Sequence, residues 1–147
     1  MKRREAREIA FAILFEKTFK DESIDEIIKN ATEDREIKID DYVYNTCVNI
    51  ELNQKELDDT ISKYLSNWKL NRLSRTALSA LRLGFYEILY ADDIPTKVSI
   101  NECVELAKKF EGEESGAFVN GVIGAFVREI EKEEKEIKAE EQKEQNN

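Results

Sequence analysis

The sequence contains no histidine and has only one proline, five glycines and two cysteines among its 147 residues. Without histidine, the chain lacks the usual general base near neutral pH, the Ser-His catalytic pair and the commonest metal ligand of proteins. This absence disfavours most hydrolase chemistry. The two cysteines, Cys47 and Cys103, lie far apart and outside any Cys-x-x-Cys spacing, so we interpret them as small core residues in a reducing cytosol.

Long apolar runs are absent as well. No stretch of the sequence approaches the ~18 apolar residues of a membrane span. A signal peptide is also disfavoured, because charged residues precede, interrupt and closely follow the apolar positions 9–15. We therefore expect a soluble cytoplasmic protein.

The few residues that break helices are unevenly placed. All five glycines and Pro95 lie past residue 83, so the first half must end its elements with Asn, Asp and Ser. Charged residues make up 37% of the chain and are mostly the helix formers Glu, Lys and Arg. Hydrophobic residues, at 41%, are enough to build one buried core. The expected fold class is all-α, with about seven helices.

The chain changes character near residue 70, where glycine-free helical patterns give way to patterns that contain glycine. We expect one domain over residues 1–137, made of two small helical subdomains, roughly 1–70 and 71–137, that share one core. Residues 138–147, rich in Glu and Lys, are expected to form a disordered acidic tail.

Helical periodicity predicts helices that start near residues 3, 24, 41, 54, 75, 96 and 113. The fourth is expected to end near Asn67, with Trp68 behind it as a plug between packed layers. Gly112 is expected to close the sixth helix. Short polar residues provide the expected N-caps, namely Asp21 or Ser23, Asp40 or Asp41, Asn53, and Ser74.

The distribution of charge gives the first functional indication. A formal net charge of −9 argues against a general nucleic-acid scaffold, because non-specific binding to phosphates requires an excess of Lys and Arg. Residues 1–20 nevertheless hold six basic side chains against three acidic ones, a local charge of +3. Arg3, Arg4 and Arg7 lie on a predicted helix beside Phe11 and Phe15, a combination suited to single-stranded RNA. The alternative is a helix with solvated arginines and core phenylalanines.

Arg82 lies in a predicted helix that is otherwise apolar, so its charge needs a partner if it is buried. We expect a structural ion pair between Arg82 and a nearby glutamate, either Glu87 or Glu102. The remaining acidic pairs are interpreted as a solvated surface, and no metal site is expected.

Four runs together resemble the NusB family of bacterial transcription antitermination factors, and the similarity spans residues 2 to about 130. The runs are Arg3-Arg4-Glu5-Ala6-Arg7-Glu8-Ile9-Ala10, Leu81-Arg82-Leu83-Gly84-Phe85-Tyr86-Glu87-Ile88-Leu89, Ile94-Pro95-Thr96-Lys97-Val98-Ser99-Ile100-Asn101-Glu102 with Ala107-Lys108-Lys109-Phe110, and Phe118-Val119-Asn120-Gly121-Val122.

The resemblance implies a non-enzymatic RNA-binding factor, without a cofactor, that pairs with NusE, a protein of the small ribosomal subunit. It implies that the pair binds the boxA element of nascent ribosomal RNA and helps assemble processive RNA polymerase complexes that read through terminators. The family fold implied is again two helical subdomains. A basic partner such as NusE would also suit this acidic chain.

Carried over by position, the resemblance implies that Arg3, Arg4 and Arg7 bind RNA. It also places six further residues at or near the RNA: Phe15, Tyr64, Lys108, Glu114, Phe118 and Asn120. Two places depart from the family pattern, since Ala117 replaces a frequent lysine and Ala77-Leu78 replaces a frequent acidic-basic pair.

On this reading, Arg7→Ala weakens binding to every RNA and lowers the salt dependence, whereas Phe118→Ala lowers discrimination between sequences. Two other hypotheses remain at this point. One is a helical protein-interaction module, such as a homodimer that hides the arginine helix, with only incidental RNA binding. The other is a fragment of an enzyme, because a similar helical domain precedes the catalytic domain of certain ribosomal-RNA methyltransferases.

Overall fold

A computed structural model describes residues 1–146 of the chain, and within these residues every regular element is helical. Seven α-helices and one short 3₁₀-helix follow one another, which confirms the all-α class. Their bounds are α1 (Arg3–Lys17), α2 (Ile24–Asp34), α3 (Asp41–Leu52), α4 (Gln54–Ser62), η1 (Leu70–Arg72), α5 (Arg75–Tyr90), α6 (Thr96–Glu111) and α7 (Glu113–Gln145).

Short polar residues begin three of the helices as predicted. The side chain of Ser23 accepts a hydrogen bond from the backbone N–H of Glu26, that of Asp40 from Val43, and that of Ser74 from Ala77. Asn53 behaves differently, because its side-chain amide donates to the Asn49 carbonyl at 2.8 Å and so closes α3 rather than capping α4. Between α6 and α7 lies Gly112, whose φ of 105° is one that L side chains rarely adopt.

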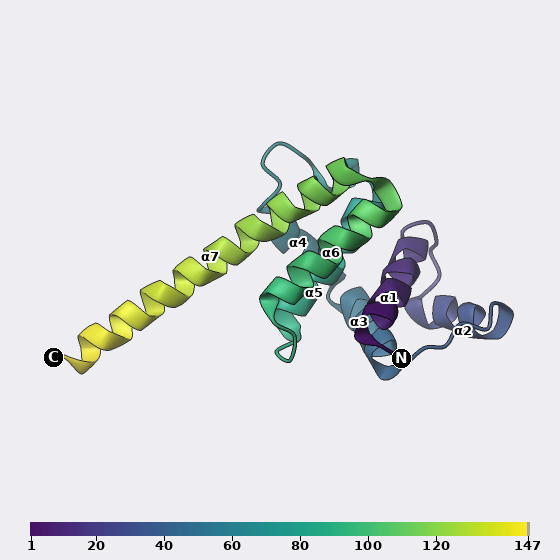
Figure 1. Cartoon of the computed structure of the whole chain (residues 1–147), viewed down its shortest axis with the longest axis horizontal. Coiled ribbons are helices and arrows are strands. Elements are labelled where there is room, and N and C mark those ends of the chain that lie inside the picture. Colours follow the sequence, from purple (N-terminus) through teal and green to yellow (C-terminus); the bar gives the residue numbers. More distant parts are fainter. Residues whose placement is uncertain (147) are drawn as a thin grey trace.

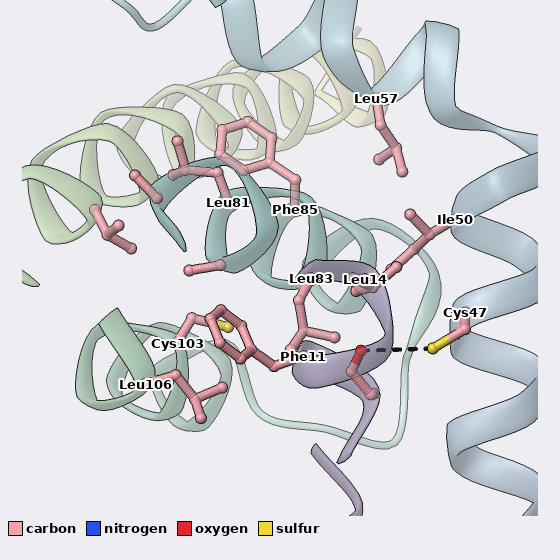
Figure 2. Close-up of a cluster of buried hydrophobic side chains, with 14 of the residues drawn as sticks. Phe11, Leu14, Cys47, Ile50, Leu57, Leu81, Leu83, Phe85, Cys103 and Leu106 are labelled. Atoms are coloured by element: carbon pink, nitrogen blue, oxygen red, sulfur yellow. Dashed lines mark hydrogen bonds between the residues drawn. The ribbon is translucent and has the colours of Figure 1, made fainter. Parts of the chain in front are cut away.

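Helix α1 contacts α2, α3, α5 and α6, and α5 contacts α1, α3, α4, α6 and α7. Helices α5, α6 and α7 pack against one another, and α7 extends far beyond them (Figure 1). One hydrophobic core joins helices α1–α4 to helices α5–α7. Figure 2 shows four of its buried side chains, Phe11, Ile50, Leu57 and Phe85. Both cysteines are free and buried in it as expected, and Cys47 Sγ donates to the Ala10 carbonyl at 3.6 Å.

Gly84 allows α5 to approach α6 and α7 closely. A Cβ at this position would lie 2.8 Å from Ile123 Cδ1 on α7 and 3.3 Å from Cys103 Sγ on α6. Any larger residue would therefore force the side chains of Ile123 and Cys103 to shift within the packed core.

Two predictions about the chain are wrong. The expected disordered tail is helical where the structure describes it, because α7 continues to Gln145; Asn147 lies outside the described residues. Extending a helix that is already nucleated adds one hydrogen bond per residue, and Glu and Lys are good helix formers. Helix α4 ends at Ser62 rather than near Asn67, and Trp68 is 57% exposed, so it does not plug packed layers. Among residues 1–146, no helix is both long and apolar enough to cross a membrane.

Candidate nucleic-acid interface

Arg7 is not on the surface, because it belongs to a buried polar network. Its side chain donates two hydrogen bonds to Glu87 on α5, from Nε to Oε2 at 2.8 Å and from an NH2 group to Oε1 at 3.0 Å. The same carboxylate accepts from the Tyr42 hydroxyl of α3 at 2.8 Å and from the Ser99 hydroxyl of α6 at 3.0 Å. Arg7 is only 2% exposed and Glu87 is fully buried, so four helices meet at one saturated carboxylate.

Electrostatics keep this network in its paired form. Burial by itself lowers the pKa of Arg7, but the hydrogen bonds and charge of Glu87 outweigh it and raise that pKa above its ordinary value. Burial, together with the charge of Glu87, raises the pKa of Tyr42, which therefore remains a hydroxyl donor. In this structure the Arg7 guanidinium is enclosed and its charge is neutralised by Glu87, so it is not exposed to an RNA phosphate, and its predicted RNA contact stays a prediction.

The ion pair predicted for Arg82 has a different partner. Arg82 donates from Nε and from an NH2 group to the two carboxylate oxygens of Asp58 on α4, each at 2.9 Å. Glu87 is taken by Arg7, and Glu102 accepts from Arg4. The predicted pairing with Glu87 or Glu102 is therefore wrong: these glutamates are close to Arg82 in the sequence, but the fold packs α4 against α5 and brings Asp58 beside Arg82.

Arg3 and Arg4 do present their charge to solvent, at the start of α1. The Arg4 side chain is 80% exposed and is held by Glu102, with its NH2 group 2.9 Å from Oε1. Arg3 stacks its guanidinium 4.4 Å from the centre of the Tyr42 ring and lies 3.9 Å from Asp93. Because the Tyr42 hydroxyl also donates to Glu87, the buried network holds in place the ring on which the Arg3 guanidinium stacks. Both side chains are oriented but accessible, as phosphate ligands need to be.

A ladder of aromatic rings runs from α6 along α1. Phe110 stacks on Phe11 with centroids 5.2 Å apart, Phe11 on Phe15 at 6.4 Å, and Phe15 meets Phe19 edge-on at 5.0 Å. Phe11 is buried, Phe15 is half-buried, and Phe19 and Phe110 are exposed. The guanidinium of Arg75 lies 4.0 Å from the centre of the Phe19 ring and also donates to the Thr18 carbonyl at 2.7 Å.

Phe118 on α7 faces a second aromatic side chain. The Trp68 and Phe118 rings meet at 77° with centroids 6.4 Å apart, and they line a pocket of about 310 Å³. Glu114, one turn before Phe118, lines the same pocket. The pocket adjoins the aromatic ladder, since Ser74, another lining residue, directly precedes Arg75 and donates to Glu111 at 2.7 Å.

Three predicted site residues lie away from this pocket. Lys108 packs its stem against Gly116 and places its ammonium 3.6 Å from Glu105 and from Glu113. Asn120 is exposed on α7, but two residues along a helix turn it away from Phe118. The half-buried Tyr64 packs on Phe126, and burial, together with the nearby carboxylates Glu129 and Glu133, raises its pKa.

The structure therefore places arginines beside accessible aromatic rings at both ends of α1 and at the start of α7, and we call this set of residues the arginine-aromatic face. It consists of Arg3, Arg4, Phe15, Phe19, Trp68, Arg72, Arg75, Phe110 and Phe118. Sequence reasoning missed five of these, Phe19, Trp68, Arg72, Arg75 and Phe110. The signal available was the density of Arg, Lys and Trp between positions 68 and 75, which is as basic as the N-terminus.

Comparisons with known proteins agree on one family. The model of the NusB family matches residues 4–128. The transcription antitermination protein NusB of Clostridium novyi (strain NT) is 45% identical over 132 residues, covering 87% of this chain and 99% of that protein. The solved structure of T. maritima NusB is 36% identical with a TM-score of 0.76, covering 88% of this chain and 92% of the other. A chain from a crystal structure of antitermination factors NusB and NusE in complex with dsRNA is 32% identical with a TM-score of 0.75, covering 84% and 93% respectively.

Proposed function

This chain belongs to the NusB family of transcription antitermination proteins, and we propose that it binds the boxA element of nascent ribosomal RNA together with NusE. In this proposal the complex promotes processive RNA polymerase complexes. The protein performs no catalytic step and acts as an adaptor between RNA and protein.

The observation that carries the proposal is the arginine-aromatic face. Guanidinium groups at Arg3 and Arg4 can contact phosphates at the start of α1 and Arg75 a phosphate near its end, while accessible rings at Phe15 and Phe118 can stack on bases. Rings can stack only on bases that are not already stacked within a duplex, so this face suits an unpaired RNA segment. The solved relative was crystallised with dsRNA, which makes a duplex of the same sequence the appropriate comparison.

The remaining predicted residues would extend the contact beyond this face. We assign Lys108 to phosphate and Asn120 to a base edge, because both lie near the turn between α6 and α7 and are at least partly accessible. Glu114 would accept from a base amino group, and Tyr64 would mark the far end of the path along α7. Arg7 would act indirectly, because its ion pair with Glu87 belongs to the network that holds Tyr42 beneath Arg3.

The overall charge of the chain supports a need for a partner. A formal charge of −9 opposes tight RNA binding by the isolated protein, because the arginines attract phosphates only near themselves while the chain as a whole repels them. A basic protein such as NusE would offset this charge and extend the RNA surface. Affinity for RNA should therefore rise when NusE is present.

The test is fluorescence anisotropy of a labelled boxA-like RNA, a scrambled RNA and a duplex of the boxA-like sequence, each at two salt concentrations with and without NusE. We expect the unpaired boxA-like RNA to bind best and NusE to strengthen that binding. Equal, weak binding of all three RNAs under every condition would contradict the proposal. A mass measurement by light scattering shows whether the exposed Phe19 and Phe110 instead join two copies of the chain.

A further inference from the structure

Arg3 is held in place by contacts outside its own helix. It is the first residue of α1, and Lys2 before it makes no side-chain cap, so the end of the helix gives this side chain no support. Its positive charge also lies at the positive end of the helix dipole, where a cation is disfavoured. The contacts that hold its guanidinium are the Tyr42 ring of α3, whose centre is 4.4 Å away, and Asp93 in the loop before α6, at 3.9 Å.

Tyr42 is itself fixed at both its backbone and its hydroxyl. Its backbone lies in the first turn of α3, which Asp40 caps by accepting from the Val43 N–H at 2.9 Å. Its hydroxyl donates to the fully buried carboxylate of Glu87 at 2.8 Å. A ring that is anchored to the interior in this way gives the Arg3 guanidinium a rigid surface on which to stack.

The stack leaves the hydrogen-bond donors of Arg3 free. A guanidinium that stacks on a ring uses its flat face, whereas its N–H groups lie along its edge. Within residues 1–146 the Arg3 guanidinium donates no hydrogen bond to the protein, and the Arg3 side chain is 45% exposed. Arg4, by contrast, donates from Nε and from an NH2 group to Glu102. Arg3 can therefore offer two parallel N–H groups to a phosphate without leaving the ring that positions it.

We propose that Tyr42 is a positioning residue for RNA binding, which acts through Arg3 by holding its guanidinium in place for one phosphate of the bound RNA. The inference rests on the proposed RNA-binding function and adds to it a residue outside the arginine-aromatic face. Tyr42 itself touches no RNA. Ordering a flexible side chain on binding reduces affinity, and the stack orders Arg3 before RNA arrives.

The experiment measures the anisotropy of the labelled boxA-like RNA with the full-length protein and NusE, at several salt concentrations. Tyr42→Leu and Tyr42→Phe both remove the hydroxyl that donates to Glu87, so the two variants differ in whether the ring remains. We expect Tyr42→Leu to bind RNA about 2- to 12-fold more weakly than Tyr42→Phe. Both should keep the wild-type salt slope, because Arg3 still neutralises its phosphate, whereas Arg3→Ala should lower that slope by about 0.7.

A double-mutant cycle shows whether Tyr42 acts through Arg3. In the Arg3→Ala background, Tyr42→Leu and Tyr42→Phe should bind RNA equally, whereas in the Arg4→Ala background their difference should persist. The matched control compares Tyr44→Leu with Tyr44→Phe. Tyr44 lies on the same helix and also donates to a carboxylate, that of Asp25 at 2.9 Å, but no arginine of the described residues stacks on its ring. This control pair should show equal RNA affinity.

A spectroscopic signal checks the stack in the protein without RNA. An aromatic ring shifts the resonances of protons that lie over its face upfield. We expect the side-chain resonances of Arg3 to be shifted upfield in the wild type and in Tyr42→Phe, and to return to ordinary positions in Tyr42→Leu. Because these resonances are recorded on folded protein, they distinguish a lost stack from a lost fold.

Contrary results would separate the positioning role from the proposed function. Equal RNA affinity of Tyr42→Phe and Tyr42→Leu, or Arg3 resonances that do not depend on the ring, overturns the positioning role while the proposed function stands. A difference between these two variants that persists in the Arg3→Ala background also overturns it, because Tyr42 then acts on RNA without Arg3. Failure of the RNA to bind the wild type with or without NusE removes the positioning role together with the proposed function.

Discussion

Replacing Arg7 by alanine tests whether the buried network, rather than an RNA contact, explains this arginine. The change removes both hydrogen bonds that Arg7 gives to Glu87 and leaves a fully buried carboxylate with only the Tyr42 and Ser99 hydroxyls. Breaking one partner of a buried pair costs about 3–5 kcal/mol, because the other charge stays buried. For a chain of this size that corresponds to a fall in Tm of roughly 6–20 °C.

The assay combines urea unfolding with RNA titration at several salt concentrations. We expect Arg7→Ala to lower the free energy of unfolding by the amount above, while any folded protein keeps the wild-type salt slope, since Arg7 contacts no phosphate. Arg4→Ala is the matched control on the same helix, because its side chain is 80% exposed. It should leave stability nearly unchanged and reduce the salt slope by about 0.7, the value for one phosphate of a single strand.

A double variant with Glu87→Ala measures the coupling within the pair. If Arg7 and Glu87 act as one unit, the double variant loses less free energy of unfolding than the two single variants together. The reasoning is refuted if Arg7→Ala leaves stability unchanged and lowers the salt slope as Arg4→Ala does.

Three further predictions concern packing, pH and the end of α7. Gly84→Ala should lower the free energy of unfolding by about 1–3 kcal/mol in urea titrations, because its Cβ would lie 2.8 Å from a side chain of α7; an unchanged midpoint would contradict the close packing. Burial raises the pKa of the Cys47 and Cys103 thiols above the ordinary 9.0, so above about pH 9 the unfolded chain loses protons that the folded chain keeps. Stability should therefore fall between pH 9 and 10.5 and be insensitive to these thiols below pH 8, whereas a rise with pH would be inconsistent. Deleting residues 133–147 removes six glutamates and three lysines and changes the formal charge from −9 to −6. RNA affinity should then increase modestly at low salt and not at high salt, with Tm unchanged, and a lower affinity would mean that this segment contacts RNA.

The helices were predictable because their signals are local. Ser23, Asp40 and Ser74 lie directly before apolar residues at helical spacing, and each forms the cap that such a residue forms in an isolated helix. The continuation of α7 to Gln145 is not predictable from charge alone, because a highly charged segment is also typical of disorder, although Glu and Lys favour helix once packing upstream has nucleated it.

Only those residues of the candidate site whose exposure follows from their place on a single helix could be predicted from the sequence. Arg3 and Arg4 lie at the surface as expected, but Arg7 is buried against a carboxylate 80 residues away, which helical spacing alone cannot reveal. Likewise, Arg82 pairs with Asp58 across α4 and α5. The corner formed by Trp68 and Phe118 joins a loop to a distant helix, so no local pattern could place them together.

The most direct test of the account is the mapping of amide and arginine side-chain chemical shifts of the isotope-labelled protein while unpaired boxA-like RNA is added. We expect shifts at Arg4, Phe15, Arg75 and Phe118, and little change at the Arg7 guanidinium or along α2. Shifts concentrated on α2 or along residues 131–145, with the arginine-aromatic face unchanged, would contradict it.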